Sequence, residues 1–122
     1  MAHLNENLNQ RLTYLSSLKD GWYDTNQGSS IDRNAIEATK SLLRHISEIL
    51  PEPSLFPSQD GSISVEWHKN IIFTLVVVID VHHDHYDFAV VINGRVNSSE
   101  FGFHEMQQLV DMITKYVQTT TI

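Results

Sequence analysis

The sequence contains no cysteine, and this absence removes several kinds of chemistry at once. Without thiols the chain has no disulfide framework, no thiolate metal site and no cysteine nucleophile. A cysteine-free sequence fits a reducing compartment, and the N-terminal residues lack the basic and apolar regions of a signal peptide. We therefore expect a cytoplasmic protein.

Basic residues are also scarce. Eight lysines and arginines stand against fifteen acidic residues, which gives a formal net charge of -7, and the basic residues are scattered between Arg11 and Lys115. Nucleic-acid binding requires a positive surface that releases phosphate counterions, so we expect no direct nucleic-acid partner. The charge favours a basic protein partner, although an acidic surface also simply keeps a protein soluble.

Long apolar runs and the motifs of common enzyme families are missing as well. The longest largely apolar run, 71–79, is too short to span a bilayer, so no membrane association is expected. The five glycines lie too far apart to form a phosphate loop. The stretch from His104 to Gln108 has glutamine where a zinc protease would place its second histidine. The sequence thus predicts neither an enzyme nor a cofactor.

Three segments repeat apolar residues at helical spacing. Gly21 is expected to close the first helix, because glycine readily adopts the left-handed conformation found at helix ends. Ser29 or Ser30 is expected to cap the second helix, with Asp32 in its first turn. Pro51 is expected to end that helix. The predicted helices cover residues 3–19, 31–50 and 103–118.

Four segments have the apolar patterns of β-strands. Ile63, Val65 and Trp67 alternate with polar residues, as in a half-buried strand, and segment 71–79 is apolar on both faces. Asn93-Gly94 predicts a type I′ hairpin, because both central positions of that turn need a positive φ. The proline-rich segment 51–57 is expected to be an extended link. The predicted strands cover residues 62–68, 71–79, 86–93 and 95–100.

These elements predict a single α+β domain over residues 1–122, a length that can bury a core without disulfides. Two N-terminal helices precede an antiparallel sheet of about four strands, and a C-terminal helix packs on that sheet. The second face of the sheet then carries an apolar patch with an acidic rim. A crossing helix, a second copy of the chain or a partner would cover it. The patch consists of Ile72, Val76, Val78, Ala89 and Val91.

One local group of metal-binding residue types lies between Asp80 and Asp87 and contains His82, His83 and His85. In an extended segment His83 and His85 would project to the same side, and imidazoles with carboxylates suit zinc or another divalent transition metal. The same residues would otherwise keep a hairpin connection hydrated, or change charge between about pH 5 and 8. A metal-binding module or metal-dependent hydrolase is therefore an alternative function.

Several short motifs stand in the first half of the chain. They are Leu18-Lys-Asp-Gly21-Trp22, Ser30, Ala35-Ile-Glu-Ala38, Leu42-Leu43, Pro53, Pro57 and Asp60-Gly61-Ser-Ile-Ser-Val-Glu66-Trp67. This pattern resembles a group of small, mostly uncharacterised bacterial and mobile-element proteins with a Gly-Trp-Asp-Gly turn, an Ala-rich helix, a Pro-rich link and an Asp-Gly…Glu-Trp strand. Here Tyr23-Asp24 follows Gly21-Trp22 in place of Asp-Gly. Proteins of this group are similar in kind to accessory proteins of toxin-antitoxin, phage and defence loci, so the resemblance implies a non-enzymatic partner-binding protein.

The leading hypothesis is a small acidic protein that binds and neutralises or regulates a basic protein partner, as an antitoxin, immunity or anti-defence protein does. Its acidic rim would occlude a basic surface, and aromatic side chains would anchor the partner. A structural homodimer is a further alternative. The candidate partner-binding residues are Asp80, Asp84, Asp87, Glu66, Tyr86, Trp22, Tyr23, Val76 and Val78.

Overall fold

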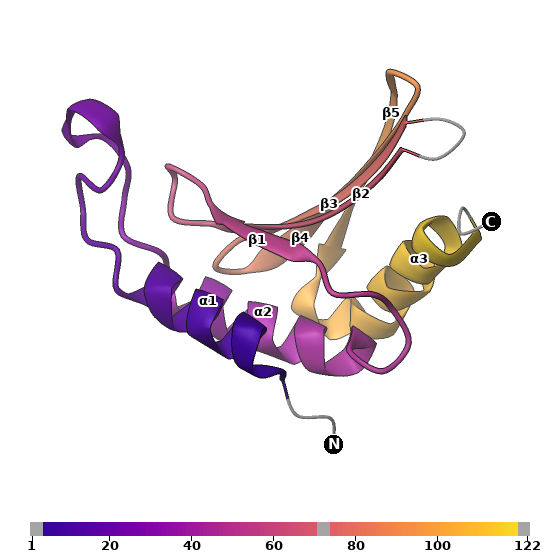
Figure 1. Ribbon diagram of the computed structural model, residues 1–122, viewed down its shortest axis with the longest axis horizontal. Coiled ribbons are helices and arrows are strands. Elements are labelled where there is room, and N and C mark those ends of the chain that lie inside the picture. The colour runs from indigo at the N-terminus through magenta and orange to yellow at the C-terminus, as the bar shows by residue number, and fades with distance from the viewer. Residues whose placement is uncertain (1–3, 71–73, 120–122) are drawn as a thin grey trace.

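The computed structural model describes residues 4–70 and 74–119, in which three helices pack against one side of a five-stranded sheet (Figure 1). The α+β class is confirmed, with one strand more than predicted. Residue 3 and residues 71–73, which belong to predicted elements, lie outside the described residues. The elements are α1 (Glu6–Ser16), η1 (Asp24–Asn26), α2 (Arg33–Ile46), β1 (Ser54–Pro57), β2 (Ile63–Asn70), β3 (Thr74–Val81), β4 (His85–Ile92), β5 (Arg95–Gly102), η2 (Phe103–Glu105) and α3 (Met106–Thr119).

Helix α1 ends earlier than predicted. Its N-terminus is capped by Asn5, whose side-chain oxygen accepts a hydrogen bond from the Leu8 backbone N–H at 2.8 Å. Its last residue is Ser16, and Ser17 follows as the C-cap in a right-handed conformation. Gly21, with φ of +86°, belongs to the next loop, where its N–H donates to the Gly28 carbonyl at 2.7 Å. The expectation that Gly21 closes the helix is therefore wrong.

Helix α2 is capped by Asp32, and the expectation that Ser29 or Ser30 caps it is wrong. The Asp32 carboxylate accepts hydrogen bonds from the backbone N–H groups of Asn34 at 2.8 Å and Ala35 at 3.3 Å, which have no acceptor within the helix. The Asp32 N–H donates to the Gly61 carbonyl at 2.9 Å, and the Ser29 N–H to the Gln59 carbonyl at 2.7 Å. These two bonds fix the start of α2 to the turn between β1 and β2, and the helix ends at Ile46, before Pro51.

The sheet is an antiparallel meander in which the strands lie in the order β1-β2-β3-β4-β5. Strand β1 lies in the segment expected to be an extended link, and its pairing with β2, in which Leu55 pairs with Val65 and Pro57 with Ile63, was not predicted. Proline is tolerated there because β1 is an edge strand and needs no second partner. The hairpin between β4 and β5 is confirmed, with φ of +49° at Asn93 and +84° at Gly94.

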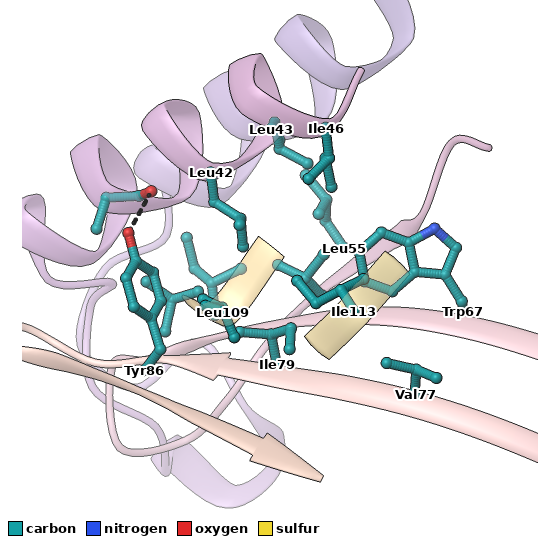
Figure 2. Close-up of a cluster of buried hydrophobic side chains, with 14 of the residues drawn as sticks. Leu42, Leu43, Ile46, Leu55, Trp67, Val77, Ile79, Tyr86, Leu109 and Ile113 are labelled. Carbon is teal, nitrogen blue, oxygen red and sulfur yellow. Dashed lines mark hydrogen bonds between the residues drawn. The ribbon is translucent and has the colours of Figure 1, made fainter. Parts of the chain in front are cut away.

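The hydrophobic core lies between the sheet and the helices (Figure 2). Val77 of β3 pairs with Val90 of β4, and Ile79 with Phe88, so that all four side chains point toward α2 and α3. This is the alternation predicted for these strands. No helix in the described ranges is long and apolar enough to cross a membrane.

Candidate functional site

All three helices lie on one side of the sheet, and the described residues place no helix on the other side (Figure 1). We call this second side the open face. A crossing helix was one of the expected covers of the apolar patch, and within the described chain that expectation is wrong. By strand register, the open face carries Ser54, Phe56, Ser64, Glu66, His68, Val76, Val78, Asp80, His85, Asp87, Ala89, Val91, Val96, Ser98 and Glu100.

The centre of the open face is apolar. Val76 pairs with Val91, which pairs with Val96, and this row crosses three strands. Val78 pairs with Ala89 in the neighbouring row. Val96 is 63% exposed, and it adds to the predicted patch a residue that the sequence analysis did not assign to it. Of the predicted patch, Ile72 lies outside the described residues, and the other four members share the open face with Val96 on β3, β4 and β5.

One end of the open face is acidic. Asp80 pairs with Asp87, and Asp87 pairs with Glu100, which puts three carboxylates in one row across β3, β4 and β5. The two strand residues with positive side chains, Lys69 and Arg95, have the parity of the helix side, and the Lys69 ammonium donates to the Val117 carbonyl at 2.9 Å. The described part of the open face therefore carries carboxylates without lysine or arginine.

Asp80 and Asp60, at this end of the sheet, have pKa values shifted in opposite directions. Burial raises the pKa of Asp80; the nearby His82 opposes this shift and the Asp87 carboxylate adds to it. The pKa of Asp60 is lowered because its carboxylate accepts hydrogen bonds from the Ser62 hydroxyl at 2.6 Å and the Ser62 N–H at 3.0 Å. The fold thus disfavours the charged form of Asp80, mainly through burial, and favours the charged form of Asp60 through hydrogen bonds.

Two histidines meet beside the acidic row. The rings of His82 and His85 stack with their centroids 4.5 Å apart and their planes 15° from parallel. Their Nε2 atoms lie 2.9 and 3.4 Å from the two carboxylate oxygens of Asp87. His83 lies apart, with a side chain that is 66% exposed and an Nε2 atom 3.6 Å from Asp84. Residues 82–84 form a tight connection rather than an extended segment, so the expected pairing of His83 with His85 is wrong.

The outer nitrogens of both rings face further carboxylates. His85 Nδ1 lies 2.6 Å from an oxygen of Asp84, and this hydrogen bond raises the pKa of His85 and lowers that of Asp84. His82 Nδ1 lies 4.0 Å from Asp60 on the β1–β2 turn. Sequence reasoning missed Asp60 and Glu100 as members of this cluster. Only the strand register and the position of the β1–β2 turn bring them there.

The aromatic pair Trp22 and Tyr23 lies in the loop between α1 and α2, which extends away from the helices (Figure 1). The rings meet edge to face with centroids 5.6 Å apart, and the Trp22 indole N–H donates to the Ser29 carbonyl at 2.6 Å. Tyr23 is 46% exposed. A Cβ at Gly28 would come within 2.9 Å of the Trp22 ring, so this glycine lets the indole pack on the loop backbone. The loop thus presents a fixed aromatic pair.

Tyr86 cannot serve as an aromatic anchor, which corrects the sequence-based expectation. Its side chain points into the core, and only 1% of the residue is exposed. The hydroxyl donates to the Ala38 carbonyl of α2 at 3.3 Å, as Figure 2 shows. Burial raises the pKa of Tyr86 to about 12. Tyr86 directly precedes Asp87 in β4, so its side chain faces the helices while that of Asp87 faces the open side.

Comparisons with protein-family models, with curated proteins and with solved structures found no match to this chain. The resemblance to small bacterial and mobile-element proteins therefore stays a prediction.

Proposed function

We propose that this chain is a non-enzymatic binding protein whose open face docks on a basic surface of another protein. The observation that carries the proposal is the composition of that face. A valine-rich centre lies next to the row Asp80, Asp87 and Glu100, and the positive strand residues have the parity of the other side. Such a face offers apolar area for affinity and one sign of charge for orientation.

Two features support a protein as the occupant. Keeping Asp80 half-buried among other acids costs stability, and such perturbed groups gather at functional sites more often than elsewhere. The loop with Trp22 and Tyr23 is hydrogen-bonded at its base to the β1–β2 turn, which carries Asp60. Partly exposed aromatic side chains beside an acidic face are the residue types that dominate interface energetics.

Binding of this kind would neutralise or regulate the partner by covering its basic surface, as an antitoxin, immunity or anti-defence protein does. A second copy of the chain is a poorer occupant of the open face. Face-to-face pairing would bring together two chains of net charge -7, and any orientation that superposes their acidic ends would put like charges in contact, which costs several kcal/mol. We therefore assign the open face to a basic partner rather than to a homodimer.

The test first isolates the partner from the native host by affinity capture and then measures its affinity with purified components in EDTA. The variant Asp84→Lys/Glu100→Lys reverses two side chains that are 62% and 73% exposed at the acidic end. The control variant Glu37→Lys/Asp111→Lys makes the same change of net charge on exposed positions of α2 and α3. We expect the first variant to weaken binding by at least about tenfold and the control to leave it near wild type.

Equal loss in both variants would contradict the proposal, because binding would then depend on net charge alone. A photo-crosslinking residue gives an independent readout of the docking position. Placed at Val96 on the open face it should crosslink to the partner, whereas at Tyr14, which is 52% exposed on α1, it should not. Crosslinking at Tyr14 alone would assign the partner to the helices instead.

A further inference from the structure

We infer that His82, His85 and Asp87 form a binding site for a divalent transition metal ion of the zinc class at the acidic end of the open face. One nitrogen from each ring and one oxygen of Asp87 all lie within 4.8 Å of one another. Two nitrogens bound to one tetrahedral zinc ion lie about 3.3 Å apart. The three atoms are therefore close enough to meet at one ion once the two stacked rings rotate toward each other.

The backbone holds these three side chains in place. His85 and Asp87 are two residues apart in β4, so both side chains point to the open face. His82 follows β3 directly, and its N–H donates to the His85 carbonyl at 2.9 Å, which closes the β3–β4 connection. The ligands thus belong to one hydrogen-bonded hairpin inside a five-stranded sheet.

The outer carboxylates provide the strongest support for coordination. A histidine that binds a metal through one nitrogen usually directs the other nitrogen to a carboxylate, a carbonyl or a water, which fixes the ring. His85 has Asp84 at 2.6 Å from Nδ1, and His82 has Asp60 at 4.0 Å from Nδ1. His85 therefore has a hydrogen-bonded carboxylate on one side and the shared Asp87 on the other, whereas Asp60 lies beyond hydrogen-bond distance of His82 and contributes only a nearby negative charge.

No other histidine among the described residues has this arrangement. His68 lies 2.7 Å from Glu66 through Nε2, and His83 lies 3.6 Å from Asp84 through Nε2, each with one carboxylate. The Nδ1 atom of His45 lies 2.7 Å from the Ser41 carbonyl within its own helix. Two adjacent rings that share one carboxylate are a more specific feature.

The donor set selects the class of metal. Two imidazoles and one carboxylate suit zinc, nickel, cobalt or copper, whereas magnesium and calcium prefer oxygen ligands alone. Glu100 of β5 has an oxygen 3.9 Å from His85 Nε2 and offers a further carboxylate at the same site. Because His82 and His85 are 23% and 28% exposed, an ion held there would face solvent or a docked partner.

The inference is tested on the isolated protein, so its outcome does not depend on the docking proposal. Protein purified without a histidine tag and stripped with EDTA is titrated with zinc chloride in competition with a chromophoric chelator. We expect one zinc ion per chain. The variant His82→Ala/His85→Ala should weaken zinc binding by more than about 100-fold, and Asp84→Asn, which removes an orienting charge, by about tenfold. Magnesium and calcium should not compete.

His83→Ala is the matched control, because His83 is the neighbouring histidine and lies outside the three-residue group. Its affinity for zinc should equal that of wild type. Equal losses in His83→Ala and His82→Ala/His85→Ala would overturn the site, as would undiminished binding in the double variant. Competition by calcium would show attraction to the acidic surface alone.

A second readout needs no substitution and so does not depend on whether a variant folds. Long-range proton–nitrogen NMR spectra report the state of each imidazole nitrogen. Zinc should shift one ring nitrogen of His82 and one of His85 and leave both nitrogens of His83 in place. Shifts confined to His83, or no shift in any ring at saturating zinc, would also overturn the inference.

Discussion

At Tyr86, a single hydroxyl group connects the sheet to helix α2. Replacing Tyr86 by Phe removes its hydrogen bond to the Ala38 carbonyl, so we expect the free energy of unfolding at pH 7 to fall by about 1 kcal/mol. The same change should alter the response to alkali. The folded-state pKa of about 12 lies above the unfolded value of 10.0, so the contribution of this group is complete below pH 10 and is lost as the pH rises toward 12.

Urea unfolding between pH 7 and pH 11 measures both effects. Wild-type protein should lose stability above pH 10, and the Tyr86→Phe variant should lose less. Tyr14→Phe is the control, because Tyr14 is 52% exposed and its removal should change neither value. An alkaline loss that is identical in wild type and Tyr86→Phe would show that another group causes it.

The sequence predicts best which face of the sheet each strand residue occupies, because side chains alternate along a strand. Val77 and Val90 were assigned to the core side, and Val76 and Val91 to the opposite side, because a strand turns successive residues to opposite faces. The same rule places Tyr86 with the core residues, where its aromatic ring cannot reach a partner. Parity in a strand was therefore a better guide than residue type.

At the scale of elements, the first turn of α2 depends on Asp32. Replacing Asp32 by Ala removes the acceptor for two backbone N–H groups, and we expect it to lower the free energy of unfolding by about 1 kcal/mol. Ser30→Ala is the matched control, because only the backbone N–H of Ser30 is seen to bond, with the Asp20 carboxylate at 2.8 Å. Urea denaturation of both variants at pH 7 compares the two residues. A larger fall in the free energy of unfolding for Ser30→Ala than for Asp32→Ala would indicate that Ser30, and not Asp32, caps the helix.

Strand β1 shows why one element was missed. Segment 51–57 contains Pro51, Pro53 and Pro57, and proline weakens any local strand pattern because it donates no hydrogen bond. In the fold, β1 is formed by pairing with β2, and the Arg11 side chain of α1 donates to the Leu55 carbonyl at 2.9 Å. Such long-range contacts stabilise an edge strand that the local sequence does not specify.

At the scale of the whole molecule, the candidate site is assembled from parts that lie far apart in the sequence. Asp60 comes from the β1–β2 turn, His82 from the β3–β4 connection, His85 from the start of β4 and Glu100 from β5. The histidine-rich segment was visible in the sequence. Which of its histidines meet, and which distant acids join them, depends on the strand register, and register is a property of the whole sheet.

The oligomeric state follows from the same distribution of charge. With a net charge of -7 and its carboxylates gathered at one end of the open face, the chain should be a monomer at low ionic strength. Sedimentation equilibrium in EDTA compares the oligomeric state at about 20 mM sodium chloride, where the chains repel one another, with that at about 1 M. At about 1 M salt the Debye length falls to about 3 Å, so this repulsion is screened. We expect a monomer at low salt at every concentration tested.

A stable dimer at low salt that Val78→Lys dissociates would mean that the open face binds a second copy, and the basic-partner proposal would then be wrong. A low-salt dimer that survives Val78→Lys would place the dimer contact elsewhere and leave the open face available for a partner.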